Sequence, residues 1–205
     1  LNSPLKICGE VELRIHQNLM GRMKGLENIE RVCSHPQSLA QCRHWLDEHM
    51  PGVERIPVSS NAEAARRARD EDGTAAIAGQ AAAEVYGLNI IVPEIEDRPD
   101  NTTRFLVIGR KLFSPSGKDK TTLLVSAGDT QAPGSLYRLL EPFARKQISL
   151  TRIESRPSRR RKWDYVFFID VEGHAEERPL KDALEELKKR ASLFKVLGSY
   201  PCAVV

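Results

Sequence analysis

Polar side chains suited to holding an anion occur twice in the first half of the chain, each time where a helix is predicted to begin. Ser34 and His35 stand before one helical pattern, and Ser60 and Asn61 stand before another. A helix N-terminus offers unpaired backbone N–H groups and a partial positive charge, which favour a carboxylate ligand. His35 could also donate a hydrogen bond or a proton. Helix capping alone accounts for the same residues, because a glutamate follows Ser60 at capping-box spacing, so both interpretations stay open.

A third polar group, Asn101, Thr102, Thr103 and Arg104, precedes an apolar run. The run is rich in residues that favour strands, so the sequence predicts a strand over 101–110. Such a strand would present hydroxyls and a guanidinium at its start. The alternative is an edge strand with a polar lead-in and no ligand.

Two motifs in the second half combine a flexible turn with charged groups. The first motif, which joins a predicted strand to a helix, is Gly134, Ser135 and Leu136. The second motif, which ends a predicted strand, is Glu154, Ser155, Arg156 and Pro157. The glycine lets a backbone approach a small ligand closely. The helix N–H groups that follow the glycine could receive a carboxylate. Together with the carboxylate, hydroxyl and guanidinium of the second motif, they could hold the two charges of an amino-acid zwitterion. Without a ligand, the same residues are a helix start and a hairpin end.

The elements that must position the first groups alternate between strands and helices. Strands are predicted at 11–16, 29–33, 53–58, 74–78 and 89–95, helices from 36, from 60 and over 79–86, and a loop over 18–28. This alternation indicates βαβ units and a parallel or mixed sheet covered on both faces. Ligands of such sheets bind beyond the carboxyl ends of the strands, where both polar turns lie.

The second half has a different order of elements. Strands are predicted at 121–127, 148–156, 165–171 and 194–197, with helices at 136–143, where Pro142 is expected to cause a kink, and at 180–191. The order βαββαβ is ferredoxin-like, with two helices on one face of an antiparallel sheet. The other face would stay open or pair with another copy.

Composition excludes several classes. The 205 residues carry 31 Lys and Arg against 28 Asp and Glu, a net charge of +3, which is too small for a dedicated nucleic-acid binder. The basic stretch 156–162 is interpreted as a solvated hairpin tip. The four cysteines form no Cys-x-x-Cys pair and have no histidine at metal-ligand spacing, which indicates reduced thiols in a cytoplasmic protein. We expect no membrane span and no signal peptide.

Several stretches resemble the prephenate dehydratase family in order. These are SHPQSLAQC (34–42), SNAEAA (60–65), AIAGQAAAEVYGL (76–88) and DRPDNTTRFLVIGR (97–110). In the second half, PGSLYRLLEPFA (133–144) and TRIESRP (151–157) resemble the two motifs of the phenylalanine-binding ACT domain of these enzymes, and 195–205 resembles the family ending. The resemblance is greatest to the proteobacterial bifunctional enzymes, in which a chorismate mutase domain precedes the dehydratase.

The resemblance implies an α/β fold in two parts. Residues 1–112 would be the C-terminal portion of a two-lobed catalytic domain similar to type II periplasmic binding proteins, 113–119 a linker, and 120–205 a ferredoxin-like ACT domain. The family's opening Gly-Pro-x-Gly-Thr-Phe-Ser-like segment and its Glu-Asn-Ser motif do not occur, so we expect most of one lobe to be absent. Gly79 and Gln80 replace a common Ser-Glu, and Ser135 replaces an alanine.

The activity implied is conversion of prephenate to phenylpyruvate, water and carbon dioxide, inhibited by L-phenylalanine, with no metal or other cofactor. Thr103 would assist departure of the hydroxyl, which requires a buried and hydrogen-bonded threonine. Substrate would contact Asn101, Arg104, Phe105, Ser34, His35, Ser60 and Asn61, although Arg104 could instead point away from the cleft. The effector would contact Gly134, Ser135, Leu136, Glu154, Ser155, Arg156 and Pro157. Pairing of ACT domains predicts a homodimer or tetramer. The alternative function is a non-catalytic phenylalanine-sensing fragment.

Overall fold

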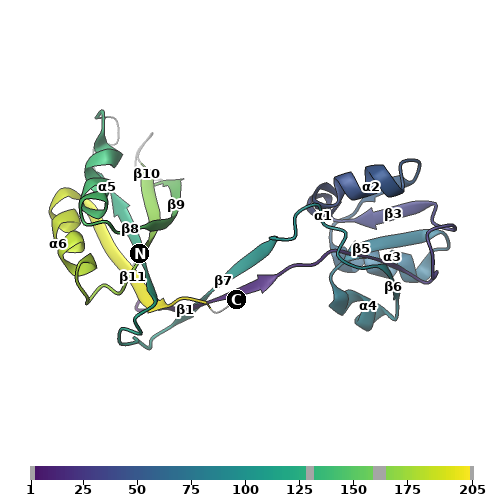
Figure 1. The fold of residues 1–205 in the computed structure, drawn as a ribbon, viewed down its shortest axis with the longest axis horizontal. Helices are drawn as coiled ribbons and strands as arrows, with labels where there is room; N and C mark the ends of the chain where they lie inside the picture. The colour runs from purple at the N-terminus through teal and green to yellow at the C-terminus, as the bar shows by residue number, and fades with distance from the viewer. Residues whose placement is uncertain (1–2, 128–131, 159–164, 204–205) are drawn as a thin grey trace. The chain divides into compact units, whose positions relative to one another are not determined.

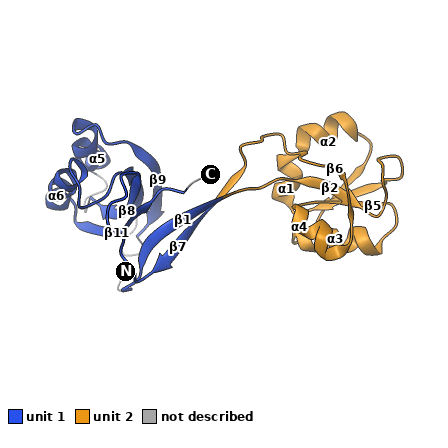
Figure 2. Cartoon of the chain, turned by 60° about the horizontal axis from the view of Figure 1, so that its bottom comes forward, with its two compact units in different colours: residues 1–12, 104–205 blue, residues 13–103 orange. Residues whose placement is uncertain are grey.

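The structure, a computed structural model, describes residues 3–127, 132–158 and 165–203 (Figure 1). The chain divides into two compact units, shown in different colours in Figure 2. Unit 2 is Leu13–Thr103, and unit 1 combines Leu1–Glu12 with Arg104–Val205. The basic stretch interpreted as a hairpin tip falls largely on 159–164, outside the described residues.

Unit 2 is built on a mixed five-stranded sheet of order β4-β3-β5-β2-β6. The strands are β2 (Asn18–Gly21), β3 (Arg31–Ser34), β4 (Glu54–Pro57), β5 (Thr74–Ala78) and β6 (Asn89–Val92). β3 runs parallel to β4 and β5, whereas β2 runs antiparallel to β5 and β6. Both faces are buried, because Ala75 and Ile77 pack in one core cluster and Ala76 and Ala78 in the other. A strand covered on both faces needs no polar alternation, which explains the apolar run of β5.

Three of the four helices of unit 2 begin or end at a local sequence signal. They are α1 (Pro36–Gln41), α2 (Arg43–His49), α3 (Asn61–Asp70) and α4 (Gln80–Tyr86). His35 caps α1 with its side chain, Ser60 caps α3, and Gly87 ends α4 in the left-handed conformation. The single helix predicted after Pro36 is wrong in one respect, because it is interrupted at Cys42.

The loop predicted over 18–28 is also wrong at its start. Residues 18–21 form β2, all four of them buried, with Leu19 paired to Ile77 on one side and to Val92 on the other. The strand is short, and its first residue, Asn18, is polar, so it shows no period-two pattern. The Asn18 side chain donates to the Ala78 carbonyl at 3.4 Å and accepts from Glu94 N at 3.1 Å. Both polar groups of this buried amide therefore have hydrogen-bond partners.

Two strands, β1 (Lys6–Arg14) and β7 (Thr102–Gly109), pair as a two-stranded ribbon along which the chain passes between the units. The prediction of a strand at each place is correct. Val11 and Leu13 alternate with Glu12 and Arg14, which is typical of a strand with its apolar side buried, but that side of β1 is exposed. Val11 and Leu13 are 45% and 49% exposed, whereas Glu10 is only 8% exposed. The carboxylate of Glu10 is buried because charged partners surround it, as described below.

The remainder of unit 1 is the predicted ferredoxin-like βαββαβ arrangement. Its elements are β8 (Asp119–Ser126), α5 (Ser135–Arg145), β9 (Leu150–Pro157), β10 (Tyr165–Glu172), α6 (Leu180–Arg190) and β11 (Leu193–Pro201). The sheet is antiparallel with the order β11-β8-β10-β9. Leu139 and Phe143 of α5 and Leu187 of α6 pack against Leu123 and Ile169 of the sheet. α5 continues through Pro142 to Arg145.

Candidate functional site

Three polar turns of unit 2 lie at one edge of its sheet. β3, β4 and β5 are parallel, so the turns that follow them share the carboxyl edge. Ser34 ends β3, Ser60 follows β4, and Gly79 follows β5. Antiparallel β2 begins at the same edge, because Asn18 pairs with Ala78. This edge is where an α/β sheet is expected to bind a ligand.

Asn61 joins two of these turns through its side-chain amide. Its Oδ1 accepts from the backbone N–H of His35 at 3.2 Å and lies 3.1 Å from Ser34 Oγ, and its Nδ2 donates to Ser38 Oγ at 3.1 Å. Ser34 is fully buried and also donates to the Ile77 carbonyl at 2.6 Å. The structure therefore brings the predicted residues together, but the polar groups of Ser34 and Asn61 hold the turns in place and are occupied by each other.

His35 and Ser60 are both more accessible than the buried Ser34. His35 Nδ1 accepts from Gln37 N at 3.2 Å, so a neutral imidazole carries its proton on Nε2 and can donate from there. Ser60 is exposed, and its Oγ accepts from Glu63 N at 3.1 Å as a helix cap. His35 can thus offer a donor to a ligand, whereas the capping role of Ser60 uses its hydroxyl as an acceptor.

A pair that the sequence analysis missed, His16 and Glu96, lies near the same edge. His16 Nδ1 is 2.8 Å from Glu96 Oε1, and the backbone N–H of Gln17 donates to Glu96 Oε2 at 2.9 Å. Burial alone would raise the pKa of Glu96, but these hydrogen bonds outweigh it and lower the pKa. A buried carboxylate that accepts a hydrogen bond from an imidazole nitrogen fixes the tautomer of that imidazole, so neutral His16 carries its proton on Nδ1. No periodicity signals this pair, because 80 residues separate its members.

Asn101, one of the predicted residues, lines a hollow of about 680 Å³ in unit 2. Its Oδ1 accepts from Gln41 Nε2 at 3.3 Å, and Gln41 Oε1 accepts in turn from Gln17 Nε2 at 3.1 Å. Gln17 Oε1 is buried and has no hydrogen-bond partner among the described residues. The lining consists of Gln37, Ala40, Gln41, His44, Glu96, Asp97, Arg98, Asp100, Asn101 and Thr102. Amide and charged groups dominate this lining, which suits a polar ligand.

The three residues expected to act on the substrate from β7 differ in their surroundings. Thr103 is exposed, and its hydroxyl makes no hydrogen bond within the described residues, so the expected buried threonine is not found. Phe105 is 51% exposed. Arg104 is held by Glu10 and Asp170 within unit 1, which agrees with the second of the two orientations expected for it.

The effector motifs fall on two features of unit 1. Gly134 has a left-handed conformation, with φ of 73°, and directly precedes α5. Glu154 and Arg156 are ion-paired at 2.6 Å and line a hollow of about 470 Å³ with Arg104, Leu106, Arg152 and Phe168. The hydrogen bond from Arg156 lowers the pKa of Glu154. Gly134, Ser135 and Leu136 do not line this hollow, and Ser155 and Pro157 alternate to the other side of β9.

Other site types are not indicated within the described ranges. No group of three His, Cys, Asp or Glu side chains there is arranged to hold a metal ion. None of the helices described has the length and hydropathy required to cross a bilayer. All four cysteines are free; Cys33 and Cys42 are buried, and Cys8 and Cys202 are half-buried.

The fold is an α/β unit whose polar turns meet at one edge of its sheet, joined in one chain to a ferredoxin-like module. Residues 1–112 match the family model of prephenate dehydratase, and residues 121–189 match that of the ACT domain. The chain belongs to the prephenate dehydratase family. The predicted fold classes of both halves are thereby confirmed.

Individual relatives agree with this assignment. The chain is 55% identical to a bifunctional chorismate mutase/prephenate dehydratase of Pseudomonas aeruginosa, a match that covers 100% of the chain and 56% of the relative. It is 38% identical to a prephenate dehydratase of Methanocaldococcus jannaschii, covering 96% of the chain and 71% of the relative. A prephenate dehydratase of Arthrobacter aurescens, solved in complex with L-Phe, superposes with a TM-score of 0.85 at 36% identity, covering 97% of this chain and 66% of that one. The chain thus spans about half the length of the bifunctional relatives that it matches.

Proposed function

We propose that the chain carries the dehydratase and ACT parts of an enzyme that converts prephenate to phenylpyruvate, water and carbon dioxide. The observation that supports this most is the match to the family over residues 1–112, combined with the joining of Ser34, His35 and Asn61 at the carboxyl edge of the sheet. The alternative, a phenylalanine-sensing fragment without turnover, shares the ACT part but not the reaction.

The reaction needs positioning and one proton donor. The ring C–O bond breaks as the hydroxyl takes a proton and leaves as water, and the C–C bond to the ring carboxylate breaks to release carbon dioxide. The electron pair of that C–C bond completes the aromatic ring. Because aromatisation drives the step, the protein must hold a dianion and assist the leaving hydroxyl.

We assign the donor role to Thr103 and a binding role to His35, whose Nε2 proton is available to a substrate carboxylate. Asn101 and Phe105 would orient the ring, and Ser34, Ser60 and Asn61 would shape the opposite wall. Since Thr103 is exposed in this chain, bound substrate must itself exclude water from the hydroxyl for the threonine to act as a donor.

We assign regulation to the two motifs of the ACT module, residues 134–136 and 154–157. We propose that L-phenylalanine binds Glu154 and Arg156 together with Gly134, Ser135 and Leu136, and that two ACT modules pair to complete the site. Reciprocal linkage then requires that substrate and effector weaken each other's binding. The free cysteines support a reducing compartment, and we place the protein in the cytoplasm.

The test is formation of phenylpyruvate from prephenate by the 205-residue chain, with and without L-phenylalanine. Thr103→Ala should lower kcat by at least about a hundredfold if the hydroxyl acts as the proton donor. Ser114→Ala, which removes an exposed hydroxyl outside both hollows, is the matched control. Near-normal turnover by Thr103→Ala would contradict the assignment. Calorimetric binding of L-phenylalanine without any turnover would instead favour the sensing fragment.

A further inference from the structure

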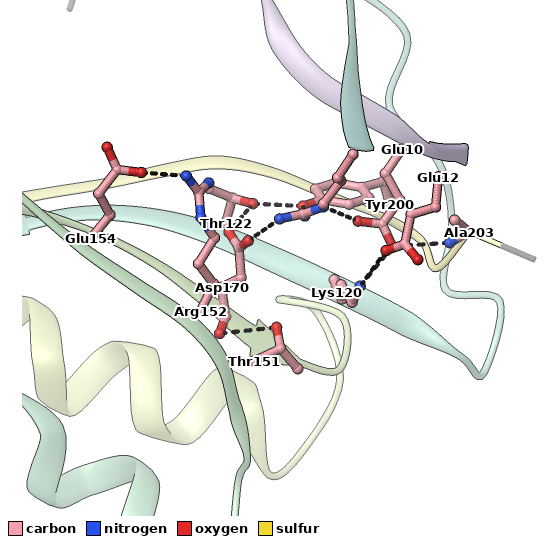
Figure 3. A network of polar contacts seen from close by, with 11 residues as sticks. Glu10, Glu12, Lys120, Thr122, Thr151, Arg152, Glu154, Asp170, Tyr200 and Ala203 are labelled. Carbon is pink, nitrogen blue, oxygen red and sulfur yellow. Dashed lines mark hydrogen bonds and ion pairs between the residues drawn. The ribbon is translucent and has the colours of Figure 1, made fainter. Parts of the chain in front are cut away.

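Unit 1 contains a buried group of charged and hydroxyl side chains, here named the Arg104 cluster, that joins the β1–β7 ribbon to the ferredoxin-like sheet. Figure 3 shows most of its members converging from separate strands. The cluster consists of Glu10 on β1, Arg104 on β7, Lys120 and Thr122 on β8, Asp170 on β10 and Tyr200 on β11. It therefore connects strands that are distant in sequence.

Arg104 is the centre of the cluster, because three of its nitrogens are held by different partners. Nε donates to Glu10 Oε2 at 2.6 Å, Nη1 to Asp170 Oδ2 at 2.5 Å, and Nη2 to the Tyr200 hydroxyl at 2.8 Å. The side chains of Glu10 and Asp170 are 0% and 3% exposed, and that of Arg104 is 21% exposed. A guanidinium committed to two carboxylates in this way is poorly available to a substrate carboxylate.

The carboxylate oxygens that face away from Arg104 are satisfied as well. Glu10 Oε1 accepts from Lys120 Nζ at 2.8 Å and from the backbone N–H of Ala203 at 2.9 Å. Asp170 Oδ1 accepts from Thr122 Oγ1 at 2.6 Å, which in turn lies 2.7 Å from the Tyr200 hydroxyl. Two carboxylates thus balance two cations. A buried ion loses its compensation when one partner is removed, so the members stabilise one another only as a set.

The backbone brings the ribbon onto the sheet face opposite the helices. Leu123 and Ile169 pack in the core with the helices, so their neighbours Thr122 and Asp170 point to the other face. The register shifts at Asp170, and again in β11 before Gly198. Such irregularities re-aim side chains and let another backbone approach closely.

Arg104 directly follows Thr103 along β7. We propose that Glu10 and Asp170 are positioning residues that anchor Arg104 on the sheet and thereby fix the strand that presents Thr103. On this proposal Arg104 is an anchor and does not recognise the substrate carboxylate. The proposal rests on the proposed function for its effect on turnover, but the anchoring itself is independent of any reaction.

Anchoring is tested by hydrogen–deuterium exchange in the 205-residue chain. Asp170→Asn and Arg104→Gln should each raise amide exchange in 104–109 by about tenfold or more, because the ribbon loses its attachment to the sheet. Arg104→Gln leaves one carboxylate unbalanced, whereas the double variant Arg104→Gln, Asp170→Asn restores charge balance. Exchange in the double variant should therefore be no faster than in Arg104→Gln. Additive effects of the two substitutions would overturn the proposal.

Kinetics distinguish an anchor from a ligand-binding arginine. If Arg104 is an anchor, the substitutions Arg104→Gln and Asp170→Asn should both lower kcat by about tenfold, with KM within about twofold of that of the unmodified chain. A large rise in KM for Arg104→Gln, with exchange in 104–109 unchanged, would overturn the proposal. Glu186→Gln, which removes a carboxylate paired with Lys146 and Arg145 elsewhere in unit 1, should change neither measurement. If the unmodified chain has no turnover, the proposed function fails while exchange still decides the anchoring.

Discussion

Gly198 offers a sharp test of how closely the β1–β7 ribbon approaches the ferredoxin-like sheet. A Cβ added at Gly198 would lie 1.9 Å from the carbonyl oxygen of Ile7, 2.8 Å from its carbonyl carbon and 3.0 Å from its nitrogen. All three atoms are backbone, so no side-chain rotation can relieve the overlap. A carbon–oxygen contact requires about 3.3 Å, so β1 would have to move by roughly 1.4 Å.

The cost of Gly198→Ala follows from what this displacement disrupts. Overpacking costs about 1–3 kcal/mol. The hydrogen bond from Lys6 Nζ to the Val196 carbonyl, 2.7 Å long, would stretch, at a cost of about 1 kcal/mol. We therefore expect the free energy of unfolding to fall by about 2–4 kcal/mol and Tm by about 10 °C, given roughly 4 °C per kcal/mol for a domain near this size.

Thermal and urea unfolding followed by circular dichroism provide the measurement, and Gly9→Ala provides the matched control on β1. A Cβ at Gly9 would meet Val107 Cβ at 3.6 Å, which is ordinary contact, so that variant should stay within about 0.5 kcal/mol of the unmodified chain. If Gly198→Ala also unfolds at the unmodified temperature, the ribbon does not contact β11 as described, and the reasoning on the Arg104 cluster fails with it.

Three further predictions concern residues of unit 2, the last of them compared with Cys8 of unit 1. Asn61→Ala should lower the free energy of urea unfolding by about 2–4 kcal/mol, because it strips hydrogen bonds from both turns, whereas Asn61→Asp keeps the acceptor for His35 N and should lower it less. Folding lowers the pKa of Glu96 below its usual value of 4.5, so ionised Glu96 stabilises the fold above pH 4.5, and this stabilisation is lost as the pH falls through the pKa of the folded state. In Glu96→Gln, the free energy of urea unfolding should therefore decline less steeply below pH 4.5. Burial raises the pKa of Cys42 to about 12, so iodoacetamide at pH 8 should modify half-buried Cys8 well before Cys42, and equal labelling by mass spectrometry would contradict this.

Local sequence predicts an element well where its signal lies within a few neighbouring residues. The caps at His35 and Ser60 and the left-handed Gly87 each depend on groups within four positions, so a short stretch of sequence carries the signal for them. The elements of the ferredoxin-like half could also be predicted, because one face of its sheet and one stripe of each helix are apolar. The fold of this half is confirmed, whereas the roles of its effector residues remain predictions.

β1 and β2 show where local patterns fail. The alternation of Val11 and Leu13 with charged residues is typical of a strand with its apolar side buried, but Glu10 is the buried residue because Lys120 and Arg104 neutralise it. β2 was missed because a four-residue strand buried between two others has no alternation to detect. In both cases the burial of a residue is determined by partners distant in sequence, which the periodicity of a single strand does not reveal.

By itself, the sequence determined the order of most elements, the polar turns at the carboxyl edge of the sheet and, through its motifs, the family. Tertiary structure alone decided which polar groups meet. Arg104 is paired across 94 residues with Glu10 and across 66 with Asp170, and His16 meets Glu96 across 80. The physical reason is that a charged side chain is buried only where an opposite charge lies beside it, and the folded backbone determines which charged side chains lie side by side.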